Sequence, residues 1–298
     1  MILKESFDTF LSSIKAGYPP ESQDKLPNAA EFFDSFTDDK IDFLKLENLA
    51  DGSSNKYFAS IAYRIIGIFM IQEARDKEIN FDLKNVWKYI SKSIKIIPSE
   101  DVISSIGSQG FLSIPLYNFK ADMSNFEFIR LHIWDNSLEK LINQDATKKF
   151  SIHTHSFHAH SWIITGKIIN DRYIVTESKN PTGYTRFTIN YNKTISKINQ
   201  HTSTANNDNI NVEVKQISHE VYMSGGSYQI KAENYHNSGT EDEDGLSATF
   251  FSFTAKNGIV EKSYVVGPND YKESEVNRRM HIDPKYLLEK IETKQKDL

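Results

Sequence analysis

The sequence predicts an α+β fold in which a helical part precedes antiparallel strands. Before residue 98, apolar residues recur every three or four positions, which is the spacing of amphipathic helices. After residue 125, apolar and polar residues alternate over short stretches separated by turn residues, which is typical of strands. We therefore expect a helical domain over residues 1–98 and, over residues 99–298, a domain of antiparallel strands that form a sandwich or a barrel, ended by a helix.

The composition favours a soluble globular protein. The chain has 298 residues, of which 39% are hydrophobic and 25% charged, enough for one large or two ordinary domains. A net charge of −5 argues against a nucleic-acid or membrane partner. Because cysteine is absent, disulfides and thiolate metal ligands are excluded. The first residues lack the basic start and apolar core of a signal peptide, so we expect a cytoplasmic location.

Four helices are expected in the N-terminal part. The first ends at Gly17, and Pro98 ends the last. Their apolar stripes predict a core, which could cover the β domain or form a homodimer contact. The other predicted helical ranges are 39–49, 56–76 and about 82–97.

The strand over residues 126–134 has two different faces. Arg130, His132 and Trp134 share one face with Phe128, and apolar residues occupy the other. Such a strand could line a barrel lumen, or it could be half-exposed. Asn170-Asp171 is interpreted as a turn, and residues 192–209 as an exposed loop. Further strands are expected over residues 160–169, 171–177, 184–191, 211–214, 227–230, 247–255 and 259–266.

Four of the nine histidines fall between residues 153 and 160. His153 and His155 form an H-x-H pair, and on a strand both imidazoles would lie on one face. Two neutral imidazoles that converge are the beginning of a site for Fe(II), Zn, Ni or Cu. The alternative is a polar strand face whose histidines meet water. His158 and His160 differ from the first pair in parity, so residues 156–157 must bend or bulge to bring either of them inward.

This pattern resembles the first motif of the cupin superfamily, G(X)5-H-x-H-(X)3-4-E-(X)6-G. His153 and His155 match its paired histidines, and Gly166 matches its final glycine. The second cupin motif supplies one more histidine, for which His236 is the candidate. The resemblance covers roughly residues 110–268 and implies an antiparallel β-barrel, the double-stranded β-helix, around one metal ion.

The chain departs from the motif at two positions. No glycine stands at its start, and its glutamate is missing. A set of three histidines without a carboxylate is similar to that of thiol dioxygenases, a branch of the superfamily that holds iron. Alternatively, His160 takes the glutamate position and makes a four-histidine site. His158 would then orient a ligand through its other ring nitrogen.

The residues and the cupin resemblance together lead us to expect a metal-dependent enzyme, a non-haem Fe(II) oxygenase that acts on a small anionic metabolite. Arg130 could clamp a substrate carboxylate, or form an ordinary salt bridge. Tyr228 could act as an acid, a base or a substrate anchor. One alternative is a non-redox isomerase or lyase that uses Zn, Ni or Mn. Another is a sensor that binds a metal or a small ligand without catalysis.

Overall fold

The computed structural model describes residues 2–79, 82–107, 110–120, 122–141, 144–191, 203–242, 244–275, 277–279 and 282–296. It confirms the α+β composition, and every strand pair among these residues is antiparallel. The helices are α1 (Lys4–Lys15), α2 (Phe43–Gly52), α3 (Lys56–Lys77), α4 (Leu83–Lys95), α5 (Gln144–Lys149) and α6 (Lys285–Lys296).

The helices begin at residues whose side chains cap them. Asn55 accepts hydrogen bonds from the first backbone amides of α3, and Asp82 does the same for α4. The predicted helix over residues 39–49 starts later than expected, because Asp42 is the cap of α2 and a two-stranded hairpin (β1, Phe36–Thr37; β2, Lys40–Ile41) precedes it. No helix in the described part of the chain is both long and apolar enough to cross a bilayer.

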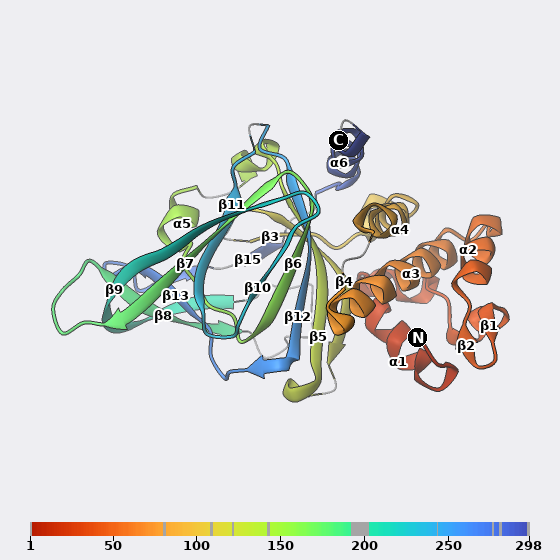
Figure 1. Cartoon of the computed structure of the whole chain (residues 1–298), viewed down its shortest axis with the longest axis horizontal. Helices are drawn as coiled ribbons and strands as arrows, with labels where there is room; N and C mark the ends of the chain where they lie inside the picture. The colour runs from red at the N-terminus through yellow and green to blue at the C-terminus, as the bar shows by residue number, and fades with distance from the viewer. Residues whose placement is uncertain are drawn as a thin grey trace.

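The described strands after residue 98 form two large sheets rather than the expected closed barrel (Figure 1). The first has the order β10-β6-β12-β5-β4-β3-β15 and the second the order β11-β7-β9-β8-β13 with β14 beside β9. The strands of the first sheet are β3 (Ser105–Gly107), β4 (Leu112–Lys120), β5 (Phe126–Trp134), β6 (Phe157–Thr165), β10 (Ser227–Ile230), β12 (Ser247–Ile259) and β15 (Asn277–Arg279). Those of the second are β7 (Lys167–Glu177), β8 (Tyr184–Tyr191), β9 (Ser203–Met223), β11 (Tyr235–Thr240), β13 (Tyr264–Pro268) and β14 (Glu273–Glu275).

Helices α1, α3 and α4 cover one face of the first sheet (Figure 1). The largest buried cluster joins apolar residues of α1, α3 and α4 to Ile129 and Leu131 of β5 and Phe250 of β12. Helix α6 joins the same layer, where Lys95 of α4 pairs with Glu292 at 2.6 Å. The division into two domains at residue 98 stays a prediction. One buried core contains residues from both sides of it.

The chain passes from the first sheet to the second at Gly166, between β6 and β7. Its φ of +79° is a conformation that favours glycine. An added Cβ would also stand 2.2 Å from Ser247 Oγ and 2.5 Å from the carbonyl oxygen of Leu246. The sheet junction therefore requires this glycine.

Two predicted turns and loops are strand in the structure. Asn170-Asp171 lies within β7, because Gly166 rather than this pair makes the bend. Residues 203–209 of the predicted loop begin the long strand β9, whereas residues 192–202 fall outside the described part. Both errors have one cause: polar residues that look like a turn in isolation are paired here with neighbouring strands.

Candidate metal centre

A short segment around His153 bridges the two edge strands of the second sheet. His153 pairs with His236 of β11 and with Val265 of β13. The backbone amides of His153 and His236 each donate to the other residue's carbonyl at 2.9 Å. Two histidines that are far apart in the sequence thereby become direct cross-strand neighbours.

Three imidazoles converge at this bridge: those of His153, His155 and His236. Nε2 of His155 lies 3.1 Å from Nε2 of His153 and 3.3 Å from Nε2 of His236. The ligand atoms of the three all lie within 4.8 Å of one another. Nitrogens bound to one ion at about 2.1 Å stand about 3.0 to 3.4 Å apart, so the two distances from His155 suit a shared metal ion.

The outer nitrogens of two rings have hydrogen-bond acceptors. Nδ1 of His153 lies 2.8 Å from the backbone oxygen of Ser151, which can only accept, so this nitrogen carries the proton. Nδ1 of His236 lies 3.0 Å from Oδ1 of Asn170 and 3.3 Å from Oγ of Ser238. A neutral imidazole protonated at Nδ1 has a bare lone pair at Nε2, so lone pairs from both rings point toward His155. Either a proton on Nε2 of His155 or a metal ion can meet these lone pairs.

Burial keeps these imidazoles neutral, which is the form that binds metals. His153 and His236 are buried, and His155 is half-buried. Desolvation lowers the pKa of His153 and takes the pKa values of His155 and His236 well below 6.5. The ring of His153 further lowers the pKa values of His155 and His236, because a positive charge on one ring disfavours a charge on the next.

An aromatic wall lies beside His155. The ring of His155 contacts Phe253 with centroids 4.8 Å apart and Phe251 with centroids 5.9 Å apart. Phe251 in turn stacks on His132 of β5 at 4.8 Å, so the polar face expected for this strand is turned toward the inside of the two sheets. His132 is buried and its pKa lies well below 6.5, through desolvation and the nearby Arg130.

The other predicted substrate contacts lie on the same interior faces. Arg130 is directly opposite Phe251 in the β5–β12 pair, and its Nη1 donates to Ser113 Oγ at 3.2 Å. Tyr228 of β10 is buried, and its hydroxyl lies 3.3 Å from Oγ of Ser238, the residue beside His236 Nδ1. Ser238 therefore lies between Tyr228 and His236. Phe251 lies between Arg130 and His155.

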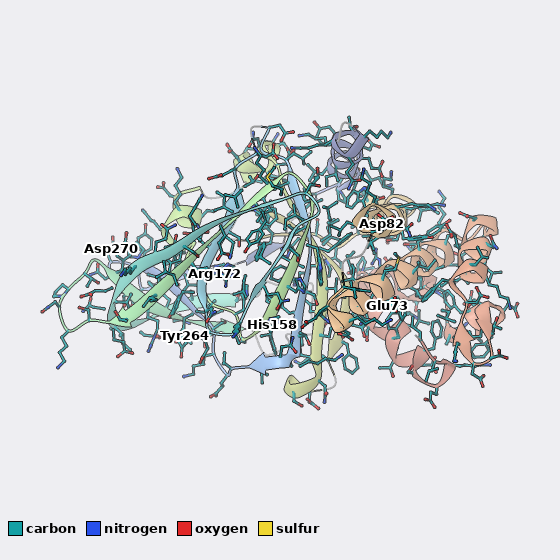
Figure 2. The ribbon with its side chains drawn as sticks, viewed as in Figure 1. Glu73, Asp82, His158, Arg172, Tyr264 and Asp270 are labelled. Atoms are coloured by element: carbon teal, nitrogen blue, oxygen red, sulfur yellow. The ribbon has the colours of Figure 1, made fainter. Side chains whose placement is uncertain are left out.

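The structure does not bring His158 and His160 to this group. They lie on the other face of β6, where the ring of His160 stacks on Trp162 with centroids 3.9 Å apart. Trp162 belongs to the core shared with the helices, whereas Ala159 and Ile163 face the interior cluster. Figure 2 labels His158 near the start of β6. The four-histidine alternative and an orienting role for His158 therefore fail, because strand parity sends both side chains toward the helices.

Sequence reasoning missed Asn170, which was interpreted as part of a turn. This side chain is fully buried in β7 and bonds to His236. A signal was available: Asn170 continues the inward parity that starts at Ile168, a buried residue two positions earlier.

The comparisons with known proteins add little to this geometry. No family model matches the chain, and no curated protein matches it significantly in sequence. Among solved structures, the hydroxypropylphosphonic acid epoxidase from S. wedmorenis aligns with 81% of this chain and 97% of its own, at 12% identity and a TM-score of 0.27. A structure titled Fe(II) HppE aligns with 83% of this chain and 98% of its own, at 11% identity and a TM-score of 0.28. CapF with the inhibitor 3-isopropenyl-tropolone aligns with 72% and 47%, at 10% identity and 0.22. Likeness this slight supports no conclusion about fold or chemistry.

Proposed function

We propose that His153, His155 and His236 bind one Fe(II) ion and that the protein is a non-haem oxygenase acting on a small anionic metabolite. The convergence of three Nε2 atoms carries the proposal. Three protein ligands leave positions on an ion open, which is typical of catalytic rather than structural sites. The cupin resemblance of the H-x-H segment points in the same direction. When bound, Fe(II) supplies the redox chemistry that oxygen activation needs.

The chain's own residues would hold the substrate and keep water away. The rings of His132, Phe251 and Phe253 form an apolar surface next to His155. Arg130 is the cation on this interior face of β5 and would bind the anionic group of the substrate. Burial raises the pKa of Tyr228, so its phenol stays protonated and would act as a hydrogen-bond donor rather than a base.

Three neutral imidazoles also suit Zn²⁺, so a non-redox enzyme is the second candidate. The absence of a carboxylate from the three-residue group favours neither metal by itself. The metal content therefore has to be measured directly.

Purification without oxygen, followed by metal analysis, tests the proposal. We expect about one iron per chain, and none in His155→Ala, because two imidazoles hold the ion too weakly. His219→Ala is the matched control, since that ring is half-exposed and bonds to Asp171 instead. Stoichiometric zinc would favour the second candidate, and a chain that binds neither metal would exclude both.

Oxygen uptake with a panel of small carboxylates and phosphates extends the test to the substrate. We expect Arg130→Gln to keep its iron and to raise the KM of an active compound by about tenfold or more, the effect of losing a charged hydrogen bond. An unchanged KM would remove Arg130 from the proposal without affecting the metal site.

A further inference from the structure

We propose that Asn170 and Glu220 are positioning residues that hold the ring of His236 with Nδ1 protonated and Nε2 free. The role in metal binding rests on the proposed function, whereas the effect on the ring itself does not. Neither residue belongs to the three imidazoles, and both lie on the far side of His236 from them.

Asn170 stands between His236 and Glu220. Its Oδ1 lies 3.0 Å from Nδ1 of His236, and its Nδ2 donates to Oε2 of Glu220 at 3.0 Å. Because a carboxylate only accepts, the amide must turn its nitrogen toward Glu220 and its oxygen toward the ring. The oxygen can only accept, so Nδ1 of His236 must be the donor.

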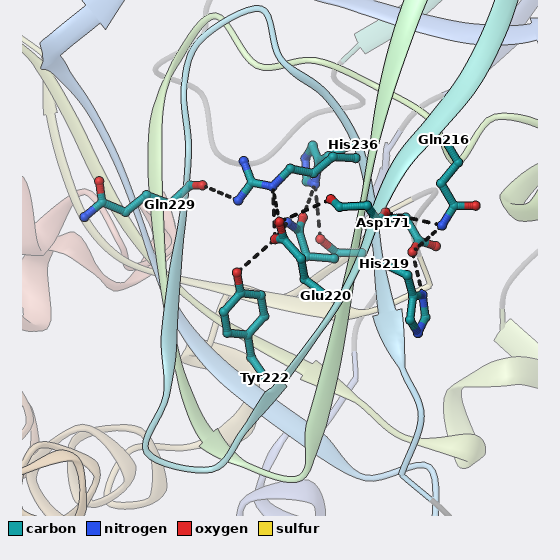
Figure 3. Close-up of polar contacts among 11 residues, drawn as sticks. Asp171, Gln216, His219, Glu220, Tyr222, Gln229 and His236 are labelled. Carbon is teal, nitrogen blue, oxygen red and sulfur yellow. Dashed lines mark hydrogen bonds and ion pairs between the residues drawn. The ribbon is translucent and has the colours of Figure 1, made fainter.

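Glu220 is itself held in place by several donors (Figure 3). Arg172 Nε lies 2.9 and 3.0 Å from its two oxygens, and the hydroxyl of Tyr222 donates to Oε2 at 2.9 Å. Ser218 Oγ adds a bond of 3.2 Å, and Nη2 of Arg172 donates to the backbone oxygen of Gln229 at 3.0 Å. Burial alone would raise the pKa of Glu220, but these donors outweigh it and the pKa lies below its usual value. The carboxylate is therefore charged and fixed.

The series of hydrogen bonds from Glu220 through Asn170 to His236 does more than fill the core. A free imidazole in water exchanges between its two tautomers and rotates, and a metal ion must select one form and one orientation. Hydrogen bonds to the non-ligating nitrogen remove that selection cost and raise ligand basicity.

The test follows the tautomer and the metal affinity separately. Nitrogen-15 NMR of the metal-free protein reports which ring nitrogen of His236 is protonated, and competition with a chelator gives the Kd for Fe(II) and Zn²⁺. Asn170→Leu keeps the volume and removes the acceptor. We expect it to lose the pure Nδ1–H form and to bind metal about 10- to 100-fold more weakly.

Three further variants make the outcome specific. Asn170→Asp combined with Glu220→Gln retains an acceptor for Nδ1–H without placing two carboxylates side by side and should keep the Nδ1–H form. Glu220→Gln alone no longer fixes the amide and should give mixed tautomers with a smaller loss of affinity. Asp171→Asn is the matched control, one residue along β7 on the outer face, where Asp171 bonds to His219 and Gln216. If Asn170→Leu does not fold, Glu220→Gln decides the question.

An unaltered His236 tautomer in Asn170→Leu or, where that variant does not fold, in Glu220→Gln would overturn the inference. If the wild type binds metal, an unchanged metal affinity in the same variant would also overturn the inference. If the wild type binds no metal but the tautomer still depends on Asn170, the proposed function fails and the positioning role stands.

Discussion

At the scale of single residues, His155 is the least satisfied member of the three-histidine group. Its Nδ1 is buried without a hydrogen-bond partner among the described residues, and its Nε2 faces the Nε2 atoms of His153 and His236. A buried polar atom without a partner destabilises a fold. The metal-free protein should therefore be less stable because of the histidine that completes its site.

His155→Phe tests this cost. Phe fits beside Phe251 and Phe253, so we expect the metal-free variant to unfold within about 1 kcal/mol of the wild type or to be more stable. Metal at about 100 times its Kd should stabilise the wild type by about 2.7 kcal/mol and leave the variant unchanged. Thermal unfolding with and without metal measures both. Ile163→Ala is the control for an ordinary core position, where a loss of about 2 to 5 kcal/mol is expected. A comparable loss in metal-free His155→Phe would refute the idea.

At the scale of elements, a buried ion pair fastens α3 to the first sheet. Nη1 of Arg75 lies 2.6 Å from Oε1 of Glu127 on β5 and 3.1 Å from Ser252 Oγ on β12. The side chains of Arg75 and Glu127 are only 4% and 10% exposed, so water hardly screens the pair. Gln72 of α3 donates to the same carboxylate oxygen at 2.9 Å. The helix is thus fixed in register against two strands, which apolar contacts alone specify less sharply.

Removing one partner of the Arg75–Glu127 pair should lower the free energy of unfolding much more than replacing both with apolar residues. Glu127→Ala leaves a buried guanidinium with Asp76 as its remaining carboxylate, so we expect a loss of about 3 kcal/mol. Arg75→Met combined with Glu127→Leu should recover most of it. Urea unfolding measures each value, and Glu73→Ala at the exposed Glu73–Lys77 pair is the control, with little expected change. Equal losses in the single and double variants would contradict the argument.

At the scale of the whole molecule, buried neutral histidines make the fold sensitive to acid. Besides the three that converge, His132, His158 and His160 have lowered pKa values, mainly because burial disfavours the charged ring. The pKa of His160 is about 4, below the ordinary value of 6.5, because of desolvation first and then the charges of His158 and Arg75. Between pH 6.5 and about 4, the unfolded chain therefore binds more protons than the folded chain, and the free energy of unfolding falls as the pH falls.

The stability that depends on a neutral His160 is fully present above pH 6.5 and is lost as the pH drops toward about 4. Its size is about 3 kcal/mol, from about 1.4 kcal/mol per pH unit. We expect His160→Phe to lose stability less steeply between pH 7 and 4 than the wild type, measured as the free energy of unfolding in urea. Parallel curves for the two proteins would show that His160 does not titrate in this way.

The sequence by itself determined the local features. Periodicity predicted the apolar stripe of α4 and the two faces of β5, since side-chain direction follows from backbone geometry alone. The H-x-H pair was a candidate from its own pattern and His236 from the cupin resemblance, and the structure brings all three together. Their role as ligands stays a proposal until a metal is measured.

Only the tertiary structure decided which faces meet. Alternation separates His158 and His160 from Ala159 and Ile163, but it does not say which set turns toward the helices. Asn170 likewise resembles a turn residue until β9 and β11 supply its partners from distant parts of the chain. Local propensity describes one strand at a time, whereas a hydrogen bond between buried side chains depends on pairing across strands, so the environment of the three imidazoles required the folded chain.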